Sequence, residues 1–195
     1  IYPVGSIGFY VPEITCRGFT ASGEKMTERS EAEKIRMDCD HNSAFVRSAE
    51  KQVKTIQPPR LYDLTTLQRD ANKYYGFTAQ QTLDYTQSLY EKKLATYPRT
   101  DSRYLTDEME ESTANLAEQM RRKYGFTKIL RMNVKQVING KKVSDHHAII
   151  PTVNVAEADY STIPTGEQKI LGLITARLLA AVGESAEITE LHLEV

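Results

Sequence analysis

Apolar residues recur at helical spacing in the middle of the chain. The first stripe consists of Leu64, Leu67, Ala71 and Tyr74. Asp63 can cap this helix and Gly76 can end it. The following segment, Thr78-Ala79-Gln80-Gln81, is a capping box, in which side chains satisfy the free backbone donors of a helix start. The pattern therefore predicts two successive helices, the second running to about Lys93.

Two more helices are predicted further along the chain. One begins near Thr106 and ends at Gly125, and its stripe consists of Met109, Thr113, Leu116 and Met120. The other begins at the capping box Thr165-Gly166-Glu167-Gln168 and ends before Gly183. Its expected buried residues are Ile170, Ile174 and Leu178.

The two ends of the chain have the pattern of strands. The predicted strands are 6–11, 44–46 with a continuation over 51–56, and 188–195, which contain β-branched and aromatic residues or alternate. A helix that starts with the capping box 30–33 is expected between the first two. A hairpin is expected over 134–143, because Asn139-Gly140 is a preferred two-residue turn.

This order predicts an α+β fold in which a mainly helical part is inserted in a β-rich domain. Pro58-Pro59 cannot supply ladder N–H groups and marks the first boundary. The expected domains are 1–58, a helical domain over 59–185, and a returning strand over 186–195.

Composition adds little until it is resolved along the chain. The 195 residues hold 25 Lys+Arg and 26 Asp+Glu, for a formal charge of −1, which at first argues against nucleic acid. Residues 121–142, however, hold eight basic residues and no acidic one. An anion-attracting patch is thus compatible with the neutral total. On charge alone, a solvated helix end followed by a Lys-rich turn is the favoured interpretation.

Cysteine usage and hydropathy predict a cytoplasmic protein (nucleoid-associated if bacterial). Cys16 and Cys39 cannot form a disulfide framework or a four-ligand zinc site by themselves. No apolar run approaches the ~20 residues of a membrane helix, and no signal peptide opens the sequence. The start at Ile1 suggests a segment of a longer protein.

The candidate chemistry is densest at residues 94–105. A tyrosine hydroxyl such as that of Tyr97 can be a covalent nucleophile, but a pKa of about 10 leaves it protonated at neutral pH. Arg99 would lie on the same side of an extended segment and could neutralise a phosphate under attack. Asp101 and Ser102 could tie the loop to the backbone. The competing interpretation is that Tyr97, one of 11 tyrosines, is a packing residue.

Three ordered blocks resemble the type IA DNA topoisomerases. The segment 87–105 (QSLYEKKLATYPRTDSRYL) is similar to their active-site region, and 58–72 (PPRLYDLTTLQRDAN) is similar to the entry into their catalytic-tyrosine domain. The segment 145–152 (DHHAIIPT) resembles their histidine motif in its topoisomerase III form. Residues 1–57 match only loosely.

The resemblance implies that Tyr97 attacks a DNA phosphodiester, forms a 5′-phosphotyrosine link and releases a 3′-hydroxyl. Strand passage and resealing would follow without ATP, because the link conserves the bond energy. Arg99 would stabilise charge on the phosphate, and His146 would contact the scissile region. His147 occupies a position where related enzymes vary.

Further DNA contacts are expected from Gln68, Arg69, Asn72 and Arg103. For the three helix residues, an exposed polar face is an equally favoured interpretation. The outline of 63–93 is also similar to a winged helix. The aromatic residues available for base stacking, or for the core, are Tyr74, Tyr75, Phe77 and Tyr104.

The resemblance also implies partners and a cofactor. The expected substrate is single-stranded or negatively supercoiled DNA, with no membrane partner. Mg²⁺ would be bound by a toprim domain elsewhere in the same polypeptide and none within this chain, because no carboxylate cluster of that kind is present. The chain alone is therefore expected to be inactive. The main alternative is a non-catalytic winged-helix nucleic-acid-binding module; a tyrosine recombinase is disfavoured because its arginines and histidines are not recognisable.

Overall fold

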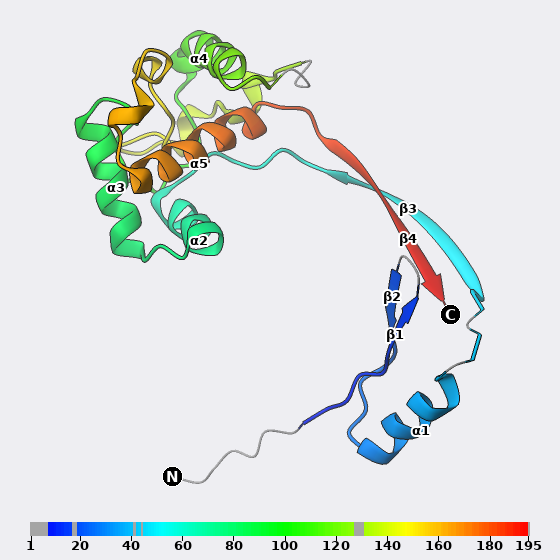
Figure 1. Ribbon diagram of the computed structural model, residues 1–195. Helices are drawn as coiled ribbons and strands as arrows, with labels where there is room; N and C mark the ends of the chain where they lie inside the picture. The colour runs from blue at the N-terminus through cyan, green and yellow to red at the C-terminus, as the bar shows by residue number, and fades with distance from the viewer. Residues whose placement is uncertain (1–7, 17–18, 41, 44, 127–130, 195) are drawn as a thin grey trace. The chain divides into compact units, whose positions relative to one another are not determined.

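The computed structural model describes residues 8–16, 19–40, 42–43, 45–126 and 131–194. The chain divides into two compact units, one formed by 1–54 together with 188–195 and the other by 55–187 (Figure 1). The second unit is thus inserted between two segments of the first. The assignment of these units to the domains predicted above stays a prediction.

The smaller unit contains short strands and one helix. Strands β1 (Glu13–Cys16) and β2 (Phe19–Ser22) form an antiparallel pair in which Glu13 faces Ser22. Helix α1 (Arg29–Cys39) has no buried residue. Strand β3 (Ser48–Ile56) pairs with β4 (Ala186–Glu194), and every residue of β3 is exposed.

Three predictions for this part were wrong. Of the strand expected over 6–11, residues 8–11 form only a bridge from Tyr10 to Met26, because Pro12 interrupts the backbone donors; residues 6 and 7 lie outside the described part. The strand expected at 44–46 starts at Ser48 instead, where pairing with the end of β4 begins, and Ala44 lies outside the described part. Helix α1 starts at Arg29 without a side-chain cap, so the capping box at 30–33 does not form.

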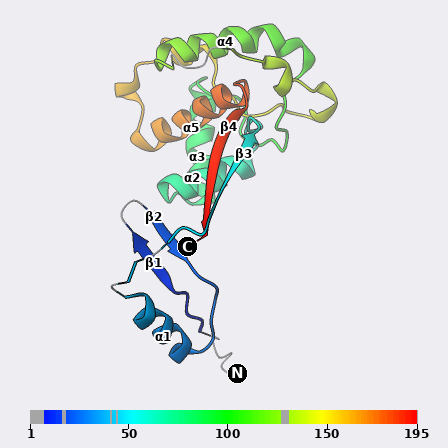
Figure 2. The same ribbon diagram turned by 90° about the vertical axis from the view of Figure 1, so that its right-hand side faces the viewer.

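The larger unit is built around one central helix. Helix α5 (Thr165–Ala181) packs against α2 (Leu64–Tyr75), α3 (Ala79–Glu91) and α4 (Glu110–Lys123), as Figures 1 and 2 show. Its buried residues include the predicted Ile170, Ile174 and Leu178. Short 3-10 helices occupy 107–109, 134–137, 140–142, 153–156 and 160–162.

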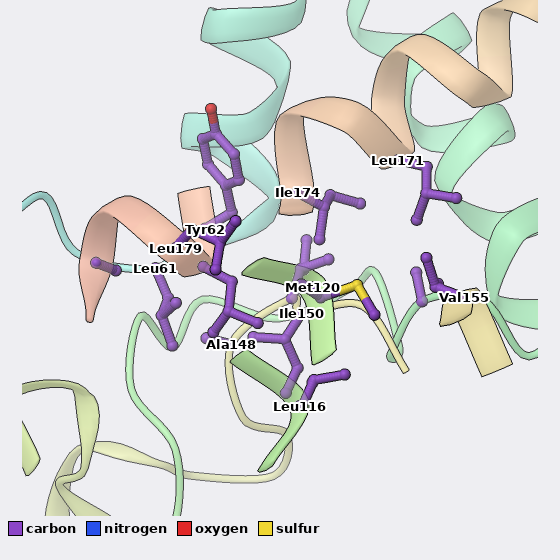
Figure 3. Close-up of a cluster of buried hydrophobic side chains, with 14 of the residues drawn as sticks. Leu61, Tyr62, Leu116, Met120, Ala148, Ile150, Val155, Leu171, Ile174 and Leu179 are labelled. Carbon is purple, nitrogen blue, oxygen red and sulfur yellow. The ribbon is translucent and has the colours of Figure 1, made fainter. Parts of the chain in front are cut away.

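The core of this unit collects side chains from helices and loops. Figure 3 shows Leu116 and Met120 of α4 with Leu171 and Ile174 of α5 in one buried cluster. Ala148 and Ile150, from the segment that carries the histidine motif, lie in the same cluster. Burying these apolar groups stabilises the unit and fixes the histidine segment on the helices.

The helix-end predictions hold for α2 and α3. The Asp63 side chain accepts from the Thr66 N–H, and Gly76 takes the left-handed conformation with φ 69°. Thr78 and Gln81 form the predicted capping box. Helix α5 begins at Thr165 as predicted, but the capping box there does not form. Pro164 is the N-cap residue, no side chain caps the helix, and the Gln168 amide donates to the carbonyls of Tyr160 and Ile163 instead.

The hairpin predicted over 134–143 is also absent. Val134 and Val137 are buried in the core, and the Asp107 carboxylate lies 2.8 Å from where a Cβ on Gly140 would be. These packing contacts override the local turn preference and produce 3-10 turns. Between residues 57 and 185, the described β-structure consists of isolated bridges, so the paired strands of a wing are absent there. The fold of the described chain as a whole is mixed helix and sheet.

Candidate functional site

The segment that carries Tyr97 is fastened to the histidine segment by Thr96. The Thr96 N–H donates to the Ile150 carbonyl at 3.0 Å, and the Ile150 N–H donates to the Thr96 hydroxyl at 3.0 Å. The Thr96 hydroxyl in turn donates to the Ala148 carbonyl at 3.2 Å. The residue before Tyr97 therefore holds the two segments together.

The loop after Tyr97 is fixed by two hydroxyl side chains. Thr100 donates to the His146 carbonyl at 2.8 Å. Ser102 donates to the Lys142 carbonyl at 2.9 Å, which agrees with its predicted role in tying the loop. Thr100 and Thr96 had no signal in the sequence beyond their place in the motif, because their partners lie far along the chain. No hydrogen bond of the Asp101 side chain occurs within the described part of the protein.

Tyr97 lies directly beside His146. Their ring centroids are 4.4 Å apart, and the edge of Tyr90 approaches Tyr97 with centroids 5.4 Å apart. Tyr97 is half-buried, whereas His146 is exposed. The Nδ1 atom of His147 lies 2.8 Å from the Ala148 carbonyl, so His147 is engaged by the backbone. The structure thus brings the candidate nucleophile and one histidine of the pair to the same exposed surface.

Arg99 is exposed, while its neighbours Pro98 and Thr100 are buried. Among the residues that the structure describes, none forms an ion pair or hydrogen bond with the Arg99 guanidinium. Its five N–H donors are therefore available to an anion such as a phosphate.

The other predicted DNA contacts have partners within the protein. The Gln68 amide donates to the Ala79 carbonyl and the Asn72 amide to the Phe77 carbonyl, both at 3.0 Å, which holds the α2–α3 connection. Arg103 donates to the Leu61 carbonyl at 3.3 Å and lies 4.0 Å from an Asp63 oxygen. Arg69 is exposed on α2. Of the two arginines, Arg69 is the one without a hydrogen bond or ion pair among the described residues.

Part of the basic stretch 121–142 is engaged within the protein. Arg121 and Arg122 both bond to Glu118, and their hydrogen bonds, that of Arg121 foremost, lower the pKa of Glu118 to about 2. Lys123 donates to the Val155 carbonyl and Lys135 lies 3.9 Å from Glu110. Among the described residues of the stretch, Arg131, Lys141 and Lys142 form no ion pair or side-chain hydrogen bond, so its charge without a polar partner lies after residue 130.

Neither a metal site nor a membrane span occurs in the described part of the chain. No group of three or more His, Cys, Asp or Glu side chains is arranged to hold an ion there. The described residues therefore do not fit a Mg²⁺ site. No helix in the same part of the chain has the length and apolar character needed to cross a bilayer.

Comparison with known proteins gives consistent matches. Residues 12–195 match a family model described as DNA topoisomerase. The chain is 39 % identical over 164 residues to DNA topoisomerase 3 of Bacillus cereus, and 42 % identical over 154 residues to DNA topoisomerase 3 of Bacillus subtilis. These alignments cover 79 % and 75 % of this chain but 22 % and 21 % of the relatives, so the chain spans about a fifth of their length.

A solved structure shares the fold. Full-length topoisomerase I from Thermotoga maritima matches 93 % of this chain with a TM-score of 0.64 and 24 % sequence identity, over 30 % of its own length.

Proposed function

The chain belongs to the DNA topoisomerase family, as a type IA, topoisomerase III-like sequence, and we propose that it supplies the nucleophile with which such an enzyme cleaves one DNA strand. Tyr97 is that nucleophile. The proposal concerns a whole protein, because this chain spans only about a fifth of the length of the curated relatives that it matches.

The proposed reaction is a transesterification. The Tyr97 hydroxyl oxygen bonds to the phosphorus of a phosphodiester and loses its proton, while the bond from phosphorus to the 3′ oxygen breaks and that oxygen gains a proton. The product is a 5′-phosphotyrosine diester and a free 3′-hydroxyl. Strand passage follows, and attack by the 3′-hydroxyl reverses the reaction without ATP, because one diester is exchanged for another.

The contact of Tyr97 with His146 carries this proposal. The contact supports the proposal because it places an exposed histidine from a distant segment beside the half-exposed Tyr97. The fastening through Thr96 gives the pair a fixed geometry before substrate binds. In the proposed reaction, His146 contacts the phosphate region and the free guanidinium of Arg99 stabilises the charge that develops there.

The remaining parts of the proposal concern the other segments of this chain and a domain outside it. Residues 1–58 and 186–195 are assigned to part of a β-rich arch that acts as a hinge, and 59–185 to the tyrosine-bearing domain. Gln68, Arg69, Asn72 and Arg103 are assigned to contacts with single-stranded or negatively supercoiled DNA in the cytoplasm. A Mg²⁺-binding toprim domain is assigned to another part of the polypeptide, so the 195-residue chain alone is inactive.

The test is covalent capture of DNA. Full-length protein is incubated with Mg²⁺ and a single strand labelled at its 3′ end, because the 5′-phosphotyrosine link holds the fragment that carries that end. The denatured mixture is then separated on a gel. The unchanged protein and Tyr90→Phe, which keeps the ring beside Tyr97, should cleave the strand, whereas Tyr97→Phe should not. Cleavage by Tyr97→Phe would remove Tyr97 from its role, and cleavage by the 195-residue chain would overturn its inactivity.

The alternative of a non-catalytic winged-helix module is not favoured. It needs the basic stretch 121–142 as a binding surface, and Arg121, Arg122 and Lys135 of that stretch are paired with carboxylates within the protein. It also needs a buried Tyr97, and Tyr97 is half-exposed.

A further inference from the structure

Two cations from distant segments converge on the ring of Tyr104. The Arg60 guanidinium carbon lies 5.4 Å from the ring centroid, and the Lys142 Nζ lies 5.0 Å from it. Both distances fall within the range of about 6 Å in which an aromatic face attracts a cation. Arg60 and Lys142 are exposed and Tyr104 is half-buried, so the cluster is open to solvent.

Hydrogen bonds fix the backbone beneath each of the three residues. The Arg60 carbonyl accepts from Arg177 Nη1 at 3.4 Å, and the Lys142 carbonyl accepts from the Ser102 hydroxyl at 2.9 Å. The same hydroxyl lies 3.2 Å from both the carbonyl and the N–H of Tyr104. The arrangement is therefore built by the protein before a ligand binds.

No described carboxylate pairs with the two positive charges of this cluster. Among the described residues, neither Arg60 nor Lys142 forms an ion pair, whereas neighbouring Arg103 lies 4.0 Å from Asp63. The two charges lie within about 10 Å of each other, roughly one Debye length, so they repel. An anion bound near both of them would be attracted by each charge.

The cluster is connected to the segments that position Tyr97. The Tyr104 carbonyl accepts from the Ala148 N–H at 2.9 Å, and Ala148 lies two residues after His146. Residues 97–104, if fully extended, span at most about 25 Å. A nucleic-acid strand at Tyr97 that follows this segment would therefore reach Tyr104.

We infer that Arg60 and Lys142, held by the Tyr104 ring, form a binding site for one phosphodiester group of the DNA strand. The ligand is a phosphate because arginine offers a planar donor fork that matches its oxygens, and lysine adds a point charge. The aromatic ring holds both cations at the site. The identity of the strand rests on the proposed function, whereas the phosphate site rests on this cluster.

The test is the salt dependence of single-strand binding, measured on full-length Tyr97→Phe protein so that cleavage does not interfere. The anisotropy of a fluorescein-labelled oligothymidine gives Kd at several salt concentrations. Arg60→Gln and Lys142→Gln should each weaken binding and reduce the slope of log Kd against log salt, and the double variant should reduce it by about 0.7, the value of one lost phosphate contact. Tyr104→Leu should weaken binding, while Tyr104→Phe, which keeps the ring, should not.

Lys141→Gln is the matched control, since Lys141 is the exposed neighbour of Lys142 and makes the same change in net charge. Its slope should equal that of the parent. Slopes for Arg60→Gln and Lys142→Gln that coincide with the control would overturn the phosphate site. Loss of the proposed function would be seen separately, as strand cleavage that persists after Tyr97→Phe alone.

Discussion

The ring of Tyr97 lies against the ring of His146, with centroids 4.4 Å apart and planes inclined by 48°. His147, the next residue, is instead engaged with the Ala148 carbonyl through Nδ1. Two adjacent histidines therefore have different surroundings, which allows their roles to be separated.

We expect His146→Ala to lower the rate of covalent strand capture about a hundredfold, the typical loss when one group that faces a reacting oxygen is removed. His147→Ala, whose side chain faces the backbone, should stay within a few-fold of the parent. The rates are measured by quenching the cleavage reaction at successive times. Equal losses in the two variants would contradict a specific role for His146.

The same substitution should have opposite effects at two glycines. Gly76 ends α2 with φ 69°, where a Cβ is disfavoured, so Gly76→Ala should lower the free energy of unfolding by about 1 kcal/mol. Gly172 lies within α5 and a Cβ there would meet no atom within 4 Å, so Gly172→Ala should raise it by about 1 kcal/mol. Urea denaturation followed by circular dichroism measures both, and shifts of the same sign would refute the explanation.

Glu167 should be important for stability because it joins α5 to the end of α3. Its side chain is 8 % exposed and accepts from Ser88 at 2.9 Å and from Lys92 at 2.5 Å. Glu167→Ala should reduce the free energy of unfolding by about 2 kcal/mol, since two bonds to a carboxylate are lost. Glu157→Ala, at an exposed position, serves as the control in the same urea titration. A loss no larger than that of the control would show that the bonds of Glu167 to Ser88 and Lys92 contribute little to stability.

Tyr62 should make the protein sensitive to alkaline pH. Burial raises the pKa of its hydroxyl above the ordinary value, and the hydrogen bond that it donates to Asp70 raises the pKa further, although Arg177 opposes this. Unfolded Tyr62 releases its proton near pH 10, before the folded form does, so its contribution to stability is present below about pH 10 and is lost as pH rises further.

Unfolding free energies measured between about pH 8 and 11 should therefore fall less steeply for Tyr62→Phe than for the parent. Tyr74→Phe, at an exposed tyrosine, should retain the slope of the parent. Identical slopes for Tyr62→Phe and Tyr74→Phe would exclude Tyr62 as the source of the alkaline sensitivity.

The parts of the fold that were predictable are those encoded by neighbouring residues. Asp63 and Thr78 cap their helices through side chains three residues apart, and the apolar stripes of α4 and α5 face the core as expected. The Thr165 capping box failed because Pro164 takes the N-cap position and the Gln168 amide bonds to the carbonyls of Tyr160 and Ile163. The Asn139-Gly140 hairpin failed because Val134 and Val137 are buried in the core. Both failures arise from contacts outside the short pattern that each prediction used.

The same distinction applies to the candidate site. Tyr97, Arg99 and His146 could be selected from the motifs, and their roles stay predictions. The contacts of Thr96 and Thr100 with the histidine segment, and of Arg60 and Lys142 with Tyr104, join residues that are far apart in the sequence. Spacing alone does not reveal such pairs.

The fastening of Thr96 to Ala148 and Ile150 has a consequence for how this region can be exchanged between relatives. Because the Thr96 side chain in 94–105 bonds to the backbone of 146–152, the two segments depend on each other and have to be exchanged together. A chimera that receives only one of them from a divergent relative inherits mismatched hydrogen-bond partners at the residue next to Tyr97. Transplantation of both segments together is the route by which the site can be moved intact.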